Sequence, residues 1–366
     1  QRAKADSALA RAEIVDLRRE LQEGNKSIFS RRLQELMEDR LQKGQQIMLF
    51  INRRGYANFV SCRSCGEVMK CPHCDVSLSE HKGGRLICHY CGYTQPMPKL
   101  CPKCGSKYIL GFKAGTQQIE EKLKELYPGV RTLRMDADTT RTKDSYEKIL
   151  SSFANGEADV LIGTQMIVKG HDFPKVTLVG ILAADLSLNA SDYRAGERTF
   201  QLLTQAVGRA GRGALPGEAV IQTYQPDHYA ITCAAAQDYE SFYQEEILYR
   251  ELSGYPPVAH MLAVQIYGKE EENVKQLALR LTDVVKSNMD FLSGKQKEQS
   301  NKKIQVLGPA PANISKINDI YRYVFYVKHA EYDVLVEVKD RLEETLRQWQ
   351  PRQMSIQFDF DPVSVL

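Results

Sequence analysis

The stretch LIGTQMIVKGHDFPKVTLVGILAAD, residues 161–185, decides the fold class of this 366-residue chain. Two apolar runs, LIG and VTLVGIL, enclose a polar loop. Short apolar runs of this kind predict buried strands. Similar runs, such as AEIVDL, IMLFIN and AVIQTY, alternate with amphipathic segments such as RRLQELMEDRLQK and ERTFQLLTQAVGRAG. Because strands that are buried on both faces and joined by helices form parallel sheets, we predict an α/β domain with helices on both faces of its sheet.

A cluster of cysteines interrupts this pattern. Eight of the nine cysteines lie within 43 residues, spaced C-x2-C-x5-C-x2-C-x13-C-x2-C-x9-C-x2-C. Each CxxC lets two thiolates reach one tetrahedral metal ion, and such clusters in a chain without a visible signal peptide favour metal over disulfides. The sequence therefore predicts two closed, structural Zn²⁺ sites. Their ligands are Cys62, Cys65, Cys71, Cys74, Cys88, Cys91, Cys101 and Cys104.

The four CxxC pairs can combine in three ways. Only five residues separate Cys65 from Cys71, which is short for two knuckles facing one ion. A nested pairing avoids this strain. The inner site would take the second and third pairs, and the outer site the first and fourth. Eight thiolates complete two sites, so we expect no ligand role for the histidines of the segment, which are His73, His81 and His89.

The C-terminal part has a different order of elements. After the breakers of SGYPP, the patterns read strand, helix, strand, strand, helix, strand. This order predicts a small α+β domain of ferredoxin-like type. In DIYRYVFYVK, aromatic and polar residues alternate, and we expect Tyr321, Tyr323 and Phe325 to line a face of the sheet. In the cysteine segment, Tyr90 and Tyr93 either stack on bases or pack beside a knuckle.

The stretch QAVGRAGR, residues 205–212, indicates a phosphate-binding function. Two arginines three apart on a helix would lie on one face, and glycines would let another group approach closely. The guanidinium group keeps its charge and suits phosphate oxygens. The loop TQMIVKGHD adds polar residues at the carboxyl end of a predicted strand, where open parallel sheets bind ligands.

These motifs together resemble a known family. The TQxxxKGxDFP loop, the RAxERTFQLLxQ helix and QxxGRxGR resemble motifs V and VI of superfamily-2 helicases. The eight-cysteine insert narrows the resemblance, as do LFINRRGYA before it, GTQQIEEKL and RMDADTT after it, and YPP before the last domain. The chain is similar over nearly its whole length to the PriA family of replication-restart helicases, also called primosomal protein N′.

The resemblance implies roles for individual residues. Arg209 and Arg212 match arginine fingers that contact the γ-phosphate of ATP, and Gln205 matches a residue lining the nucleotide site. Gly170 and Asp172 match positions that couple nucleotide state to DNA. It also implies the nested pairing of the two zinc sites. Residues expected at the DNA backbone are Thr164, Gln165, Lys169, Arg53 and Arg54.

The chain departs from a complete motor in one respect. It contains neither GxxxxGK[ST] nor an acidic Mg²⁺ box, and AAD at residues 183–185 is no DExH box. We therefore interpret it as a C-terminal half that hydrolyses ATP with Mg²⁺ only when the first motor lobe is present. The expected parts are the end of that lobe or a linker (1–12), a RecA-like second lobe (13–61 and 106–226), a double-zinc insert (62–105), a helical linker (227–257) and the α+β domain (258–366).

Composition limits the remaining possibilities. The net charge is only +3, but the segment from Cys62 to Cys104 holds six Lys/Arg against three acids. No apolar run approaches the about 18 residues of a membrane span. The resemblance implies 3′→5′ unwinding, DNA forks and single strands as substrates, and contacts with single-stranded DNA-binding protein and other primosome proteins. We expect a cytoplasmic, nucleoid-associated bacterial protein, monomeric and without a membrane partner. The alternatives are a non-catalytic zinc module that binds DNA or a partner, and a different superfamily-2 motor, which the cysteine insert disfavours.

Overall fold

A computed structural model describes residues 10–51, 60–74, 76–81, 84–110, 115–136, 139–140, 142–167, 172–189, 192–287 and 304–363, without the side chains of Leu110 and Lys143. The chain divides into two compact units. The first comprises Gln1–Val68, Pro98–Ala190 and Arg194–Tyr243. The second comprises Met69–Met97, Ser191–Tyr193 and Gln244–Leu366. The cysteine segment is therefore shared between the two units.

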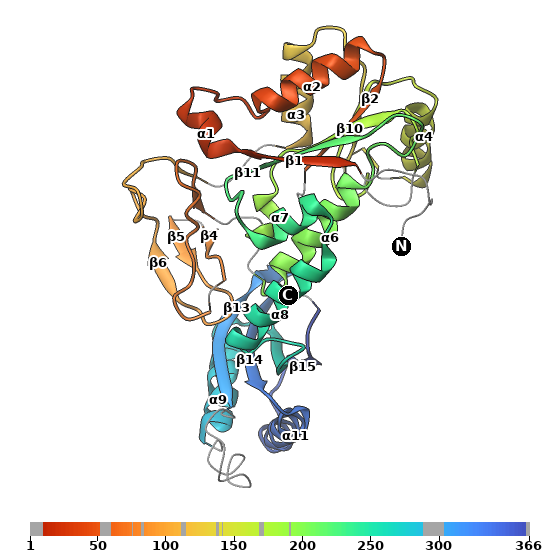
Figure 1. The fold of residues 1–366 in the computed structure, drawn as a ribbon. Helices are drawn as coiled ribbons and strands as arrows, with labels where there is room; N and C mark the ends of the chain where they lie inside the picture. Colours follow the sequence, from red (N-terminus) through yellow and green to blue (C-terminus); the bar gives the residue numbers. More distant parts are fainter. Residues whose placement is uncertain are drawn as a thin grey trace. The chain divides into compact units, whose positions relative to one another are not determined.

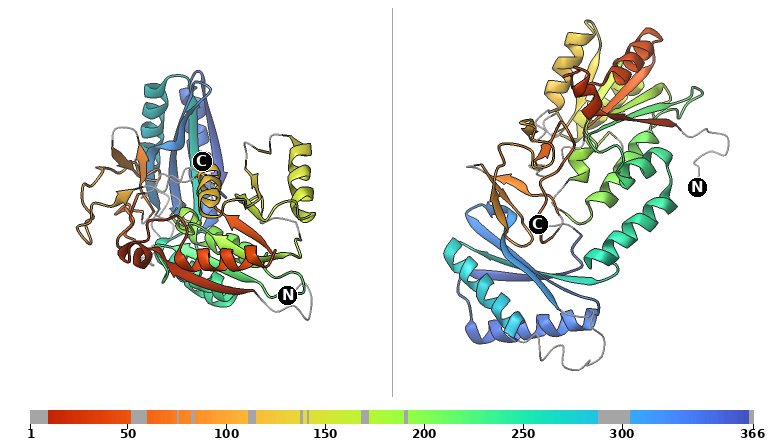
Figure 2. Two further views of the ribbon diagram at one scale, coloured as in Figure 1. Left: turned by 90° about the horizontal axis from the view of Figure 1, so that it is seen from above. Right: turned by 60° about the vertical axis from the view of Figure 1, so that its left-hand side comes forward.

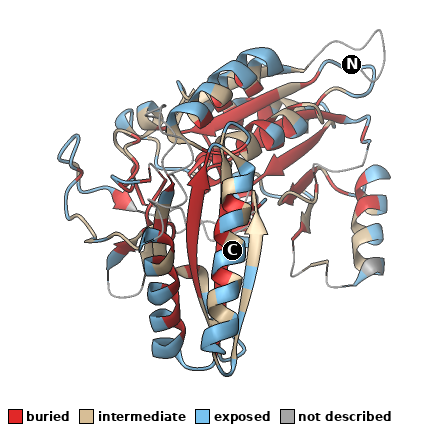
Figure 3. Cartoon of the chain, turned by 90° about the horizontal axis from the view of Figure 1, so that it is seen from below, coloured by how far each residue is buried: buried red, intermediate tan, exposed pale blue. Residues whose placement is uncertain are grey.

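The first unit is built on a six-stranded sheet with the order β1-β11-β10-β2-β9-β8 (Figure 1). Every pairing in it is parallel. Three of its inner strands, β10, β2 and β9, are buried along their whole length, and β11 is buried except at Glu218, as the apolar runs predict (Figure 3). The strands are β1 (Arg11–Asp16), β2 (Gln46–Phe50), β8 (Thr132–Met135), β9 (Val160–Gly163), β10 (Val176–Ile181) and β11 (Glu218–Thr223).

Helices cover both faces of this sheet. On one face, Ile47 and Leu49 of β2 share a core with α2 (Arg31–Gln42) and α3 (Thr116–Leu126). On the other face, Met48 and Phe50 share a core with α4 (Lys143–Ala154), α6 (Ala195–Val207) and α7 (Tyr229–Ala236). This alternation confirms the predicted doubly covered parallel sheet. The short helices α1 (Leu17–Gln22) and α5 (Asp185–Leu188) follow β1 and β10.

Short strands frame the cysteines. In the first unit, β3 (Ser61–Cys62) pairs with β7 (Ile109–Leu110). In the second unit, β4 (Ser79–His81), β5 (Arg85–Ile87) and β6 (Thr94–Pro96) form an antiparallel three-stranded sheet. Helix α8 (Tyr239–Ser253) runs across the boundary between the two units.

The C-terminal part of the second unit is an antiparallel four-stranded sheet with the order β13-β14-β12-β15. Chain order and sheet order together are those of a ferredoxin-like fold, which confirms that prediction. Figure 2 shows the sheet with its two long helices. The elements are β12 (His260–Gly268), α9 (Glu271–Ser287), β13 (Gln305–Ile317), β14 (Ile320–His329), α11 (Tyr332–Trp349) and β15 (Met354–Phe360).

The two faces of this sheet have different neighbours. Leu262, Val264 and Ile266 of β12 share a core with Tyr323 and Phe325 of β14, and both helices close this core. Tyr323 and Phe325 therefore line a sheet face, as predicted. Residues of the opposite register, such as Tyr326, point to the other face, where the inner part of the cysteine segment packs.

The described residues include no helix long and apolar enough to cross a membrane.

Candidate functional site

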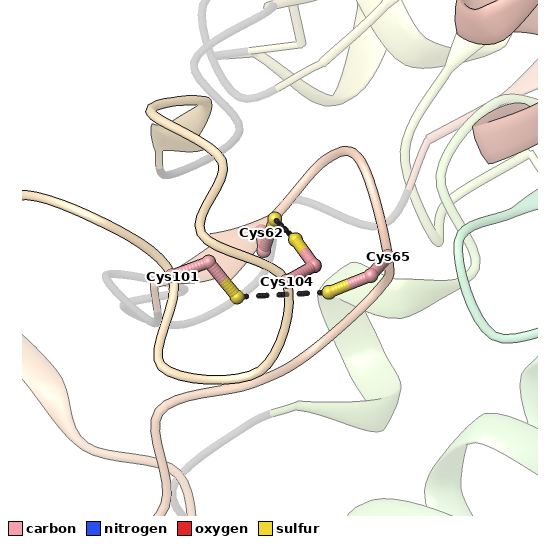
Figure 4. A group of neighbouring side chains, drawn as sticks. All are labelled: Cys62, Cys65, Cys101 and Cys104. Atoms are coloured by element: carbon pink, nitrogen blue, oxygen red, sulfur yellow. Dashed lines mark hydrogen bonds between the residues drawn. The ribbon is translucent and has the colours of Figure 1, made fainter.

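The outer cysteine cluster belongs to the first unit. Cys62 and Cys65 come from one knuckle, and Cys101 and Cys104 come from the other (Figure 4). The Sγ atoms of Cys62 and Cys104 lie 3.6 Å apart, and those of Cys65 and Cys101 also lie 3.6 Å apart. The side chains range from fully buried Cys62 to exposed Cys104. This cluster therefore lies at the surface of its unit.

The inner cluster belongs to the second unit. It joins Cys71 and Cys74 to Cys88 and Cys91, as the nested pairing predicts. The Sγ atoms of Cys71 and Cys91 lie 3.5 Å apart. Cys71, Cys74 and Cys88 are buried.

The geometry of both clusters fits zinc. Within each cluster, all four sulfur atoms lie within 4.8 Å of one another. Four thiolates placed tetrahedrally at about 2.3 Å from a Zn²⁺ ion are separated by about 3.8 Å, close to the spacings of 3.5 and 3.6 Å found here. Four sulfur ligands leave no coordination position for water or substrate. Such a set indicates a structural site and excludes a catalytic one.

The inner knuckle is held by aromatic contacts. Tyr90 is only 1% exposed, and its ring centroid lies 5.0 Å from that of Tyr326 and 6.3 Å from that of Tyr255. The Tyr255 hydroxyl donates to the carbonyl of Cys74 at 3.4 Å. Burial raises the pKa of Tyr90 well above its ordinary value. Of the two roles considered for Tyr90, base stacking is wrong and packing beside the knuckle is correct.

Lysine and histidine contacts extend this packing. The Lys328 ammonium lies 4.0 Å from the centroid of the Tyr255 ring and donates to the carbonyl of Ser253 at 2.8 Å. Burial lowers the pKa of Lys328 to about 8. His89 lies against the carbonyl of Pro311, 3.2 Å from its Nδ1. The described histidines His73, His81 and His89 belong to neither cysteine cluster.

The QAVGRAGR stretch is helical only in its first three residues. Helix α6 ends at Val207, with Gly208 as its C-cap. Arg209 and Arg212 therefore lie in the turn that follows, and the expectation that both lie on one helix face is wrong. Glycine stops the helix here because it costs conformational entropy within a helix and favours its end.

At Gly211, the group that approaches closely is the protein's own backbone. Gly211 has φ +71°, and a Cβ built on it would lie 2.4 Å from the backbone nitrogen of Gly217. Its own backbone nitrogen donates to the carbonyl of Val176 at 3.0 Å. These contacts fix the turn against the start of β10. The glycine at this position serves the fold of the turn.

The turn nevertheless gathers charged side chains. Arg212 donates from Nη1 to Asp172 at 2.8 Å and from Nε to the carbonyl of Gly208 at 2.7 Å. Burial, followed by the charge of Arg212, lowers the pKa of Arg209, while Asp172 opposes this effect. The charge of Asp172 thus acts on both arginines. Gln205 is exposed on the last turn of α6.

The described residues of the loop TQMIVKGHD lie at two different edges of the sheet, one at the carboxyl end of β9 and the other at the amino end of β10. Thr164 and Gln165 follow the carboxyl end of β9, as predicted. Asp172 instead precedes the amino end of β10, and Arg212 precedes β11. Because the amino ends of parallel strands lie at the opposite edge from their carboxyl ends, the expectation that Asp172 lies at a carboxyl end with Thr164 and Gln165 is wrong. Lys169, Gly170, Arg53 and Arg54 lie outside the described residues.

The sequence reasoning missed the role of Asp185. Its carboxylate accepts hydrogen bonds from the Thr223 hydroxyl at 3.0 Å and from the Tyr224 backbone nitrogen at 3.0 Å. Burial raises the pKa of Asp185 to about 6. The side chain therefore ties the end of β10 to the end of β11. No motif in the sequence indicates this pairing.

Three protein-family models match the chain. The PriA DNA helicase Cys-rich region (CRR) domain matches residues 71–96, the helicase conserved C-terminal domain matches residues 100–214, and the primosomal protein N C-terminal domain matches residues 251–363.

Curated relatives agree with these models. The replication restart protein PriA of Bacillus subtilis (strain 168) is 43% identical over 355 residues, covering 96% of this chain and 43% of the relative. The proteins of the same name from Synechocystis sp. and Chlamydia muridarum are 42% and 41% identical, covering 96% and 86% of this chain and 41% of each relative. The chain thus spans about two fifths of the length of these relatives.

Proposed function

This chain belongs to the PriA family of replication restart proteins, and from that premise we propose that it forms the C-terminal part of an ATP-dependent DNA helicase. The whole protein would unwind DNA 3′→5′ at stalled or repaired forks and initiate primosome assembly. Its partners would be forked and single-stranded DNA, single-stranded DNA-binding protein and other primosome proteins. It would act as a monomer in the bacterial cytoplasm, at the nucleoid.

The arginine pair beside Asp172 is the observation that carries this proposal. In the proposal, Arg209 and Arg212 contact the γ-phosphate of an ATP molecule held with Mg²⁺ by another lobe, and Gln205 lines the same site. Arg212 is already held by Asp172 and Gly208, so little order would be lost when phosphate binds. Arginine charge placed there stabilises the charge that develops during phosphoryl transfer.

The DNA contacts belong to the other edge of the sheet. Thr164 and Gln165 stand at the carboxyl end of β9, where open α/β sheets bind ligands. We propose that they contact the backbone of the single strand, together with Lys169, Arg53 and Arg54. Gly170 and Asp172 would couple this edge to the nucleotide. Residues 164–167 at the one edge and residues 172–175 at the other belong to the same segment of the chain.

The eight cysteines would hold two Zn²⁺ ions, one in each unit. Bound zinc supplies folding free energy at such sites, and its completed coordination leaves it no direct part in the reaction.

The chain alone should not hydrolyse ATP, because its 366 residues contain no GxxxxGK[ST] motif. The test measures DNA-stimulated ATP hydrolysis by this chain alone and after mixing with a fragment of a relative that carries that motif. We expect no activity alone, activity after mixing, and a loss of about 10³-fold or more with Arg209→Ala or Arg212→Ala. Arg31→Ala, an exposed arginine of α2, is the matched control.

Two results would contradict the proposal. Hydrolysis by the chain alone would show a nucleotide site that the sequence does not reveal. DNA binding without any hydrolysis after mixing, also in the full-length protein, would favour the alternative of a non-catalytic zinc module.

A further inference from the structure

A cavity of about 210 Å³ lies beside the outer cysteine cluster within the first unit. One wall is formed by Arg63 and Tyr108 of the cysteine segment. The opposite wall includes Leu182 and Tyr224, which directly follow β10 and β11. The carboxyl ends of strands are the usual ligand-binding edge of an open parallel sheet. None of the sequence motifs described above points to this cavity.

The outer cluster fixes the first wall. Arg63 lies between Cys62 and Cys65, and its backbone nitrogen donates to the carbonyl of Tyr108 at 2.9 Å. Gly66 closes the knuckle with φ +78°, and a Cβ built on it would lie 2.3 Å from the carbonyl oxygen of Tyr224. The knuckle therefore presses against the strand end. Binding of metal by the four thiolates would hold both walls at one spacing.

The lining combines apolar surface with polar groups, and its one acid, Glu20, is paired with Arg31. Leu17, Leu21, Ile28 and Leu182 supply aliphatic surface. Tyr108 is 50% exposed, so its ring is accessible. Among the described residues, the hydroxyl groups of Tyr108 and Tyr224 and the ammonium of Lys26 make no hydrogen bond or ion pair. The cavity therefore offers flat apolar contact, two hydroxyl groups and a cation.

This combination suits a nucleobase attached to its phosphate backbone. A base has apolar faces that stack on aromatic rings and polar edges that bond to hydroxyl groups. Cations at the mouth attract the adjoining phosphates. Lys99 and Lys107, which flank the last CxxC pair of the outer cluster in the sequence, are also exposed.

We propose that this cavity binds one base of a DNA single strand, with Tyr108 stacked on the base and with Lys26 at an adjoining phosphate. The outer cysteine cluster acts as a positioning element for this site. The proposal rests on the proposed function, since it takes single-stranded DNA to be a substrate of the protein.

The test uses the zinc-loaded full chain and a short oligodeoxythymidine carrying a single 2-aminopurine. Fluorescence anisotropy gives the affinity, and quenching of 2-aminopurine reports stacking. We expect Tyr108→Ala to weaken binding by about 5- to 100-fold and to reduce the quenching. Ile28→Trp, which places a larger side chain in the cavity lining, should also reduce the quenching. Tyr239→Ala removes a tyrosine of α8 that is 58% exposed, and it should change neither value.

The outcomes separate this inference from the proposed function. If the unaltered chain binds no single-stranded DNA at low salt, the proposed function itself is contradicted. If it binds DNA and both cavity variants match the unaltered chain in affinity and quenching, the cavity does not hold a base and this inference is overturned. A cavity that serves a protein partner would give that second result.

Discussion

The outer and inner cysteine knuckles hold their sulfur atoms at nearly the same spacing but enclose different residues. The outer knuckle Cys62–Cys65 encloses Arg63 and Ser64, both half-buried, and Arg63 lines a cavity. The inner knuckle Cys88–Cys91 encloses His89 and Tyr90, both buried against the C-terminal sheet. The spacing of the sulfur atoms is thus nearly the same in the exposed and in the buried surroundings. The enclosed residues decide whether a knuckle joins a hydrophobic core or leaves a surface free for a ligand.

The largest expected difference between the clusters follows loss of a ligand. Cys88→Ser removes a fully buried inner ligand, whereas Cys104→Ser removes an exposed outer one. Structural zinc in small peptides contributes about 10 kcal/mol or more of binding free energy. We expect Cys88→Ser to expose the amides of β13 and β14 to hydrogen exchange. Cys104→Ser should affect only the outer knuckles and the residues around Tyr224.

Hydrogen exchange followed by mass spectrometry, with zinc content measured on the same samples, checks this pair. If both variants show the same hydrogen exchange in the C-terminal sheet, the inference that only the inner cluster supports this sheet is contradicted.

The second test concerns the aromatic contact of the inner knuckle. Tyr90→Ala should lower the free energy of unfolding of the second unit by about 3–5 kcal/mol, because a large, fully buried ring leaves a cavity. Tyr93→Ala is the matched control, since Tyr93 lies two residues after Cys91 of the same knuckle and is only half-buried. Urea unfolding monitored by the fluorescence of Trp349, the only tryptophan, measures both. Similar losses for the two variants would contradict the docking role of Tyr90.

The third test concerns the contact of the outer knuckle. Gly66 and Gly105 occupy equivalent positions, with φ +78° and +69°. Nothing lies within 4 Å of a Cβ built on Gly105, whereas one on Gly66 meets the Tyr224 carbonyl at 2.3 Å. Gly105→Ala should therefore cost about 1–2 kcal/mol of stability from its left-handed backbone alone. Gly66→Ala should cost about 2–5 kcal/mol, because overpacking is added.

Thermal unfolding of the zinc-loaded proteins measures these costs. Equal costs would mean that the outer knuckle does not press against the end of β11.

The last test concerns a pH dependence on the outer side, where the carboxylate of Asp185 accepts a hydrogen bond from the backbone nitrogen of Tyr224. Its pKa is about 6 in the folded protein, against about 3.9 in an unfolded chain. Between these values the folded state binds more protons, so the carboxyl group makes stability fall as pH rises from about 4 to about 6. Asp185→Asn removes this contribution. As the pH rises from 4 to 7, the free energy of unfolding of the variant should increase by up to about 3 kcal/mol relative to that of the unaltered protein. The free energy of unfolding of both proteins is measured as a function of pH. If the difference between them does not change with pH, Asp185 does not titrate with a raised pKa.

Features with a local or periodic cause could be predicted from the sequence. Two cysteines in a CxxC turn must point at one ion, so their spacing alone indicates both clusters. Runs such as VTLVGI are apolar at every position but Thr177 because both faces of β10 are covered. The order of elements after Gly254 likewise predicts the ferredoxin-like sheet, since each helix has to return the chain beside an existing strand.

Other features depend on contacts between residues far apart in the chain. The sequence does not show that Asp172 meets Arg212 forty residues later, or that Asp185 receives the backbone of Tyr224. It also does not show that the turn after α6, which carries the two arginines, docks through Gly211 against Val176. The cavity between Arg63 and Tyr224 likewise depends on residues far apart in the chain.

The sequence by itself determined which residues form strands, helices and metal clusters, because those choices follow from spacing, hydrophobicity and turn chemistry. Only the tertiary structure decided which cluster joins a core and which one borders a cavity. That outcome depends on the shape and charge of surfaces that meet only after the chain has folded.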